Sequence, residues 1–299
     1  MHSMSLFCKS FEGDLHRIGR LIASVEAFNA DNIPVYISVP SKELALFKNT
    51  VGTHRVNWLS DEEIISYQLH GDGGRYQQWD GRLSQQVIKA EFWRLGVSEN
   101  YVCLDSDSEF IQNFYLGSFL NEASNTPYTV ICQAKEHLQL AENRRIAKVL
   151  QEFRAQSAAG KNIFYRSGPD YDFCTPPVIW SSKVWRDLAE RYLEPRGMSF
   201  WDAIAVLPAE LRWYGEALLQ YRSIDLLPIE PLFRVYLYDW QYARMQKMGE
   251  TTDKLRALYL GVVKQSNWEF EMDAGQLIER KPPLSRLLRR ARRSLAQFR

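Results

Sequence analysis

Strand-like and helix-like stretches alternate through the first hundred residues, and this alternation constrains the fold more than any other feature. Residues 5–8 and 34–39 are short apolar runs typical of strands. Between them, residues 14–29 carry apolar side chains at helical spacing, with Asp14 as a candidate N-cap. Two further strands are expected, at 55–59 and 101–104. Three further helices are expected: one at 41–47, one that begins at a Ser60–Glu63 capping box, and one at 84–95. Such alternation is typical of βαβ units, so we predict an α/β fold with a mainly parallel sheet flanked by helices.

The stretch at 101–111 joins an apolar strand to two aspartates, Asp105 and Asp107. Ligands of open α/β sheets bind outside the carboxyl ends of the strands. Because alternate residues of an extended segment point to the same side, the two carboxylates are expected to bind one Mg²⁺ or Mn²⁺ ion. A turn that only caps the following segment is the alternative. A second such pair, Asp170 and Asp172, follows a turn without a preceding strand, so position favours the first pair.

Two lysines are candidate contacts of a bound phosphate. Lys9 follows the first strand directly, and Lys89 lies on the helix at 84–95, where it could equally face water. Before that helix, residues 70–82 contain four glycines, and we expect an irregular loop that covers a ligand.

The second half is expected to hold a strand near 128–132, a long polar helix at 138–158 and a helix capped by Ser181. Aromatic residues then crowd the stretch at 200–221 and either stack on a sugar ring or, at this helical spacing, form core. They are Trp201, Trp213, Tyr214 and Tyr221. Asp202 and Glu216 lie among them and are candidate general bases for a hydroxyl, although each could be a helix-surface acid.

The composition, 45% hydrophobic and 24% charged, is that of an ordinary globular chain of one large domain or slightly more. We find no run of 18 apolar residues and no apolar signal core, so we expect a cytoplasmic protein. The four cysteines lie far apart, which favours buried thiols over a disulfide framework or a zinc site.

Residues 281–299 contain seven basic residues and no acid; subtracting these from the net charge of +1 leaves −6 on the rest of the chain. Apolar residues recur at helical spacing in this tail, at Leu284, Leu287, Leu288, Ala291, Leu295 and Phe298. The pattern predicts a basic amphipathic helix on an anionic membrane surface. The alternative is a helix packed on its own domain or on a partner. Nucleic acid is not the expected partner, because the tail lacks interleaved aromatic residues.

The phrases DNIPVYISVP, YVCLDSDSEFI, WSSKVW, WYGEALLQY and PLFRVYLYDWQY together resemble an uncharacterised bacterial group of GT-A-type glycosyltransferases, over about residues 5–245. This class uses nucleotide-sugar donors and has a Rossmann-like fold with an Asp-x-Asp metal motif. The resemblance implies that Asp107 ligates the divalent ion at the donor diphosphate and that Asp105 contacts the ion or the donor ribose. It places Glu216 where inverting members carry the base of a Gly-Glu-Asp-like segment, although Ala217 departs from that pattern.

Many members of the class add a late histidine as a metal ligand. No histidine follows His137 here, and Leu237 stands where one is expected, so a water or Asp239 would complete the metal site. The implied domains are a GT-A-like catalytic domain at 1–250, with a nucleotide-sugar half at 1–111 and a mixed acceptor-side half at 112–250, then a helical extension at 251–280 and the basic tail at 281–299.

The expected function is divalent-metal-dependent transfer of a sugar to a glycan or lipid-linked acceptor, in the assembly of bacterial lipopolysaccharide, capsule or O-antigen. The protein would then lie on the inner face of the plasma membrane. One alternative is a non-catalytic protein that binds polyanions or membranes. A haloacid-dehalogenase-type phosphatase is disfavoured, because it carries its Asp-x-Asp on the first strand and has Thr or Val where this chain has Glu109.

Overall fold

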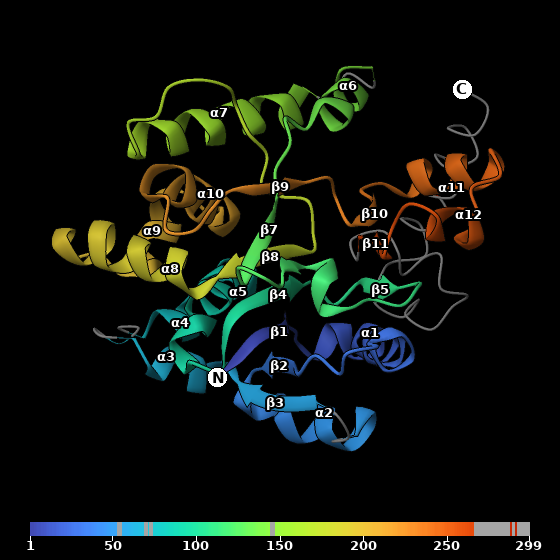
Figure 1. Ribbon diagram of the computed structural model, residues 1–299, viewed down its shortest axis with the longest axis horizontal. Helices are drawn as coiled ribbons and strands as arrows, with labels where there is room; N and C mark the ends of the chain where they lie inside the picture. The colour runs from blue at the N-terminus through green and yellow to red at the C-terminus, as the bar shows by residue number, and fades with distance from the viewer. Residues whose placement is uncertain are drawn as a thin grey trace.

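The centre of the molecule is a five-stranded sheet of order β3-β2-β1-β4-β8 (Figure 1). The computed structural model describes residues 1–52, 56–68, 71, 74–143, 147–265, 288 and 291. In the sheet, β1 (His2–Lys9), β2 (Val35–Val39), β3 (Val56–Ser60) and β4 (Ser98–Leu104) are parallel, and β8 (Val178–Ser181) pairs antiparallel with β4. The mainly parallel α/β sheet is therefore confirmed.

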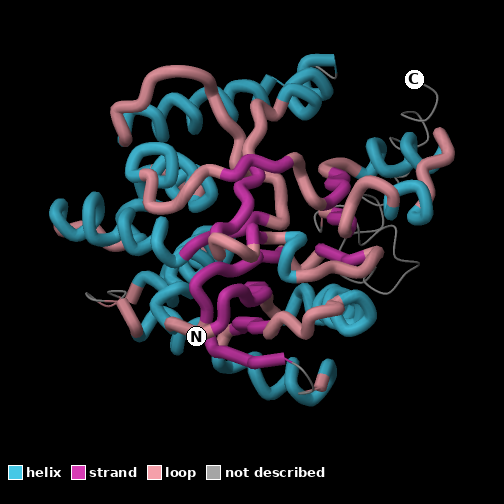
Figure 2. The backbone as a smooth tube through the Cα atoms, viewed as in Figure 1, coloured by secondary structure: helices cyan, strands magenta, loops and turns pink. Residues whose placement is uncertain are grey.

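Helices cover both faces of this sheet (Figure 2). Because neighbouring residues of a strand point to opposite faces, Leu6 and Phe7 of β1 enter different cores. The Leu6 core includes α1 (Leu15–Phe28) and α2 (Leu44–Val51). The Phe7 core includes α3 (Asp61–Ser66), α5 (Gly81–Glu91), α8 (Ser182–Leu188), α9 (Phe200–Val206) and α10 (Glu210–Tyr221).

Two small sheets lie beside the main one. The first has the order β10-β11-β5 and the second β6-β7-β9. Their strands are β5 (Ser108–Phe110), β6 (Leu120–Asn121), β7 (Thr126–Val130), β9 (Leu227–Ile229), β10 (Phe233–Tyr236) and β11 (Gly261–Lys264). The strand expected near 128–132 is thus β7, outside the main sheet.

The helical extension expected at 251–280 is only partly helical in its described residues, 251–265. After α12 (Thr252–Arg256), the chain forms β11 between β10 and β5. Its valines favour a strand, and pairing with β5 ties this segment to the body. Residues 266–280 lie outside the described part of the chain.

Two further expectations differ from the structure. The segment at 70–82, expected as an irregular loop, contains α4 (Arg75–Gln78) and the start of α5. The single helix expected at 138–158 is two helices, α6 (Lys135–Asn143) and α7 (Ala147–Ile163). The remaining helices are α11 (Asp239–Lys247), the π-helix Ala189–Leu193 and the short 3₁₀ helices Glu12–Asp14, Ser41–Glu43, Phe92–Leu95, Leu116–Ser118 and Glu194–Arg196.

Several predicted helix ends are confirmed. The Ser60 hydroxyl accepts a hydrogen bond from the Glu63 amide at 3.1 Å, and Ser181 caps α8. Gly96 ends the helix at Leu95 with a φ of 64°, a left-handed conformation that glycine adopts without a Cβ clash. Asp14 precedes α1, but its carboxylate accepts from Arg17 at 2.6 Å and not from a helix amide.

The aromatic residues at 200–221 form core. Trp201, Trp213 and Tyr214 are buried, so the core interpretation is confirmed and these three side chains do not offer a face to a sugar. Tyr221 is half-buried beneath the Arg191 guanidinium.

Among the described helices, none is both long enough and apolar enough to cross a membrane. The predicted basic helix at 281–299 lies outside the described residues, apart from Leu288 and Ala291.

Candidate active site

The strand order reverses direction between β1 and β4, because the chain runs from β1 outward to β3 and then returns to pair β4 on the other side of β1. Ligands bind at such a switch point, outside the carboxyl ends of the two strands. Here the strands are followed by Ser10 and Ser106, and the Ser106 hydroxyl donates to the Ser10 hydroxyl at 3.1 Å. We call residues 9–10 and 105–108 the switch-point edge.

Asp105 and Asp107 lie at this edge, as predicted, but in a turn. The Ser108 amide donates to the Asp105 carbonyl at 3.0 Å, and the Lys264 amide donates to the Asp107 carbonyl at 3.4 Å. The premise of an extended segment is therefore wrong, since the chain turns sharply from β4 into β5. Within the described part of the chain, no three His, Cys, Asp or Glu side chains form a group that could hold a metal ion.

Lys89 reaches Asp105 directly. Its Nζ lies 2.6 Å from Asp105 Oδ1, and the side chains of Lys89 and Asp105 are 9% and 39% exposed. Burial alone would lower the pKa of Lys89, but the neighbouring carboxylate of Asp105 raises it well above its ordinary value. Lys89 is thus a buried, charged group with its ammonium at the switch-point edge.

Lys9 is also held by a carboxylate. Its Nζ lies 2.9 Å from Asp61 Oδ2, and the Tyr76 hydroxyl donates to the same oxygen at 2.8 Å. Asp61 is fully buried, and this burial raises its pKa while Lys9 and Tyr76 oppose the shift. The pair ties the end of β1 to α3 and α4, and a role of Lys9 in phosphate binding stays a prediction.

Glu216 is buried inside an ion pair. Its carboxylate accepts from Arg166 Nε at 2.5 Å and from Arg166 Nη2 at 2.9 Å, and its side chain is 2% exposed. Asp202 is the third residue of α9 and forms a capping box with Ser199. Although burial opposes it, hydrogen bonds from Ser199 and Arg75 lower the pKa of Asp202. Both carboxylates thus have structural partners.

Glu210, which the sequence analysis did not select, lies near the edge. Its buried side chain interacts electrostatically with Lys89 and Asp105, and its amide donates to Gln86 Oε1 at 3.3 Å. Burial raises the pKa of Glu210, and Lys89 opposes the shift. The sequence signal that could have identified Glu210 was an acid in the first turn of a helix that begins shortly after Pro208.

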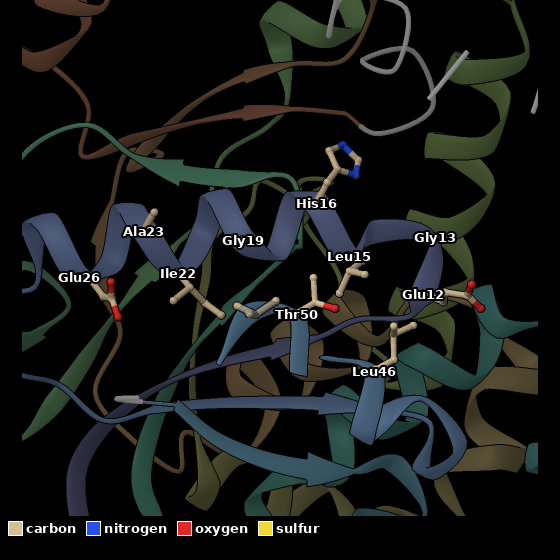
Figure 3. A pocket seen from close by; sticks show the side chains of 11 residues that line it. Glu12, Gly13, Leu15, His16, Gly19, Ile22, Ala23, Glu26, Leu46 and Thr50 are labelled. Atoms are coloured by element: carbon tan, nitrogen blue, oxygen red, sulfur yellow. The ribbon is translucent and has the colours of Figure 1, made fainter. Parts of the chain in front are cut away.

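A groove of about 640 Å³ lies between α1 and α2 (Figure 3). Glu12 and Leu46 stand at one end and Ile22 and Glu26 at the other. None of the predicted site residues lines this groove.

The fold and the placement of these groups define a mixed α/β protein with acidic and basic side chains gathered at the switch point of a mainly parallel sheet. The chain belongs to the Family of unknown function (DUF6492), which it matches over residues 3–247. Among solved structures, it is similar to mouse xyloside xylosyltransferase 1 in its apo form, with a TM-score of 0.47 and 8% sequence identity, over 88% of this chain and 98% of that chain. No curated protein matches the sequence.

Proposed function

We propose that this protein is a GT-A-type glycosyltransferase that moves a sugar from a nucleotide-sugar donor to an acceptor hydroxyl. The observation that carries the proposal is the position of Asp105: it follows β4 at the switch point, is partly exposed and has a buried cation beside it. The motif phrases of the sequence support the same class. The donor diphosphate would lie at the switch-point edge, with its charge next to Lys89.

We propose that this edge holds a divalent cation. Asp105 and Asp107 supply hard carboxylate oxygens, the ligand type that Mg²⁺ and Mn²⁺ prefer. With two protein carboxylates, the other positions of Mn²⁺ or Mg²⁺ are available to donor phosphate oxygens. When bound, the ion would offset the charge that develops on the leaving diphosphate. Asp239 remains a proposed third ligand of the ion, and its side chain lies outside the part of the chain that the structure describes.

We propose Glu210 as the acceptor-activating base. Its carboxyl lies buried on α10 and interacts electrostatically with Lys89 and Asp105 of the proposed donor site, where a general base would take the proton of an acceptor hydroxyl. In the reaction, Glu210 takes the proton of the acceptor hydroxyl as the oxygen bonds to the anomeric carbon and the nucleoside diphosphate leaves. Glu216 and Asp202 stay predictions for this role, because their carboxylates are held by Arg166 and by Ser199 with Arg75.

The cellular setting is proposed from the sequence. The basic stripe at 281–299 would hold the enzyme on the anionic inner face of the plasma membrane, where glycan or lipid-linked acceptors of lipopolysaccharide, capsule or O-antigen are elongated.

Thermal unfolding with a panel of nucleoside diphosphates and Mn²⁺ tests the function. A ligand at 100 times its Kd adds about 2.7 kcal/mol of stability, so one member of the panel should raise Tm clearly. Asp105→Ala and Asp107→Ala should lose this shift, whereas Asp170→Ala should keep it. A protein that no nucleotide stabilises would instead be the non-catalytic binding module. The phosphatase alternative is further disfavoured because the motif follows the fourth strand of the chain.

A further inference from the structure

We infer that Lys89 is the resident counter-cation of Asp105, and that it makes binding of a divalent cation depend on the donor diphosphate. This inference rests on the proposed function, because it concerns the same site. Lys89 Nζ lies 2.6 Å from Asp105 Oδ1, a distance of a charge-assisted hydrogen bond. A protein cation therefore already occupies one of the oxygens that a metal ion would use.

The lysine is held in place by its surroundings. Its side chain is 9% exposed, and the Tyr101 hydroxyl donates to its backbone carbonyl at 3.0 Å. Glu210 on α10 interacts electrostatically with the same ammonium. The buried Lys89 ammonium cannot leave for solvent without breaking its ion pair with Asp105.

The charges then determine the order of binding. A divalent cation ligated by Asp105 places two positive charges beside the Lys89 ammonium, and this repulsion is strong where water is excluded. The metal ion alone should therefore bind weakly. A diphosphate brings negative charge that attracts both cations, so its arrival relieves the repulsion. By linkage, each ligand then raises the affinity of the other by the same factor.

The second Asp-x-Asp pair offers a matched control. Lys161 forms an ion pair with Asp170, whose side chain is 38% exposed, close to the 39% of Asp105. This pair joins α7 to the following loop and does not involve the switch-point edge. Replacing Lys161 changes the charge of an exposed Asp-x-Asp segment in the same way, without touching the proposed site.

Calorimetric titration measures Mn²⁺ binding to the full chain, alone and with UDP or GDP present. Wild type should bind Mn²⁺ weakly alone and at least about tenfold more tightly with the nucleotide that stabilises it. Lys89→Met should bind Mn²⁺ alone at least about tenfold more tightly than wild type, and should bind the nucleotide with Mn²⁺ at least about tenfold less tightly. Lys161→Met should match wild type in both titrations, and Lys89→Met/Asp105→Ala should lose the gained Mn²⁺ affinity.

Additive binding of Mn²⁺ and nucleotide to wild type would overturn the inference without any variant. Equal or weaker Mn²⁺ binding by Lys89→Met, repeated with Lys89→Gln where the first variant folds poorly, would also overturn it. A wild type that binds neither UDP nor GDP counts against the proposed function, while the Mn²⁺ titration without nucleotide still decides whether Lys89 opposes the metal ion.

Discussion

The ion pair between Arg166 and Glu216 gives the sharpest test of which carboxylates are structural. Both hydrogen bonds of the Arg166 fork end on Glu216, whose side chain is 2% exposed against 13% for Arg166. Arg166 Nη1 also donates to the carbonyls of Ser167 and Pro169, so the pair fixes the loop after α7 onto α10. Glu216→Gln keeps the shape and one acceptor but leaves the guanidinium without its counter-charge.

The expected cost is large for a single substitution. Removing one partner of a buried ion pair costs about 3–5 kcal/mol, and the retained amide acceptor places Glu216→Gln near 3. For a chain of this size, that loss lowers Tm by roughly 6 °C. Removing both charges in Arg166→Met/Glu216→Leu should restore most of the stability, because the desolvation cost of both ions disappears together.

Thermal and urea unfolding measure the stability of the two variants, and rates of sugar transfer per folded molecule measure their activity. Together these measurements separate a structural role of the ion pair from a catalytic one. The exposed Glu190→Gln is the control and should change stability by less than about 0.5 kcal/mol. If Glu216→Gln melts like wild type and loses turnover at unchanged donor affinity, the pair is not structural and Glu216 is the base after all.

Glu210→Gln should lower kcat by about 10²-fold or more with donor affinity nearly unchanged. In wild type, kcat should fall at acidic pH with an apparent pKa above the ~4.3 of an ordinary glutamate, because burial raises the pKa of Glu210 and only its ionised form accepts a proton. A Glu210→Gln variant that keeps the wild-type kcat and the same fall of kcat at acidic pH would exclude Glu210 as the base. The full chain should sediment with anionic liposomes at low salt, be released at high salt, and lose binding when truncated after Arg280. Binding that survives the truncation would refute the role of the tail.

Local signals in the sequence predicted the local structure well. The serine caps at Ser60 and Ser181 and the left-handed Gly96 were predictable, because each depends on neighbours within a few residues. The apolar strand before Asp105 was predictable for a related reason. The last four residues of β4, Tyr101–Leu104, are buried and mostly apolar, as in a strand covered on both faces, so the acids that follow them mark its carboxyl end.

Long-range pairing was not predictable from one sequence. β8 joins the main sheet next to β4 although some seventy residues separate them, whereas the strand at β7, much closer in the chain, lies in another sheet. Lys89 and Asp105 are 16 residues apart and Arg166 and Glu216 are 50 apart. Apolar periodicity locates a helix and its buried face, but it does not say which charged partner the fold brings to that face.

Helix α10 shows why the choice between its acids required the structure. Glu210 and Glu216 are six residues apart, so at about 100° per residue they point about 120° away from each other around the helix. Glu216 lies against α7, where a Cβ on Gly160 would stand 3.4 Å from its Cγ, and Glu210 lies toward Lys89. On this helix, buried Glu216 therefore packs against α7, and buried Glu210 lies on the side toward the switch-point edge. A sequence motif around Glu216 selects α10, but only the packing of α5 and α7 against this helix determines which of its acids lies near the proposed donor site.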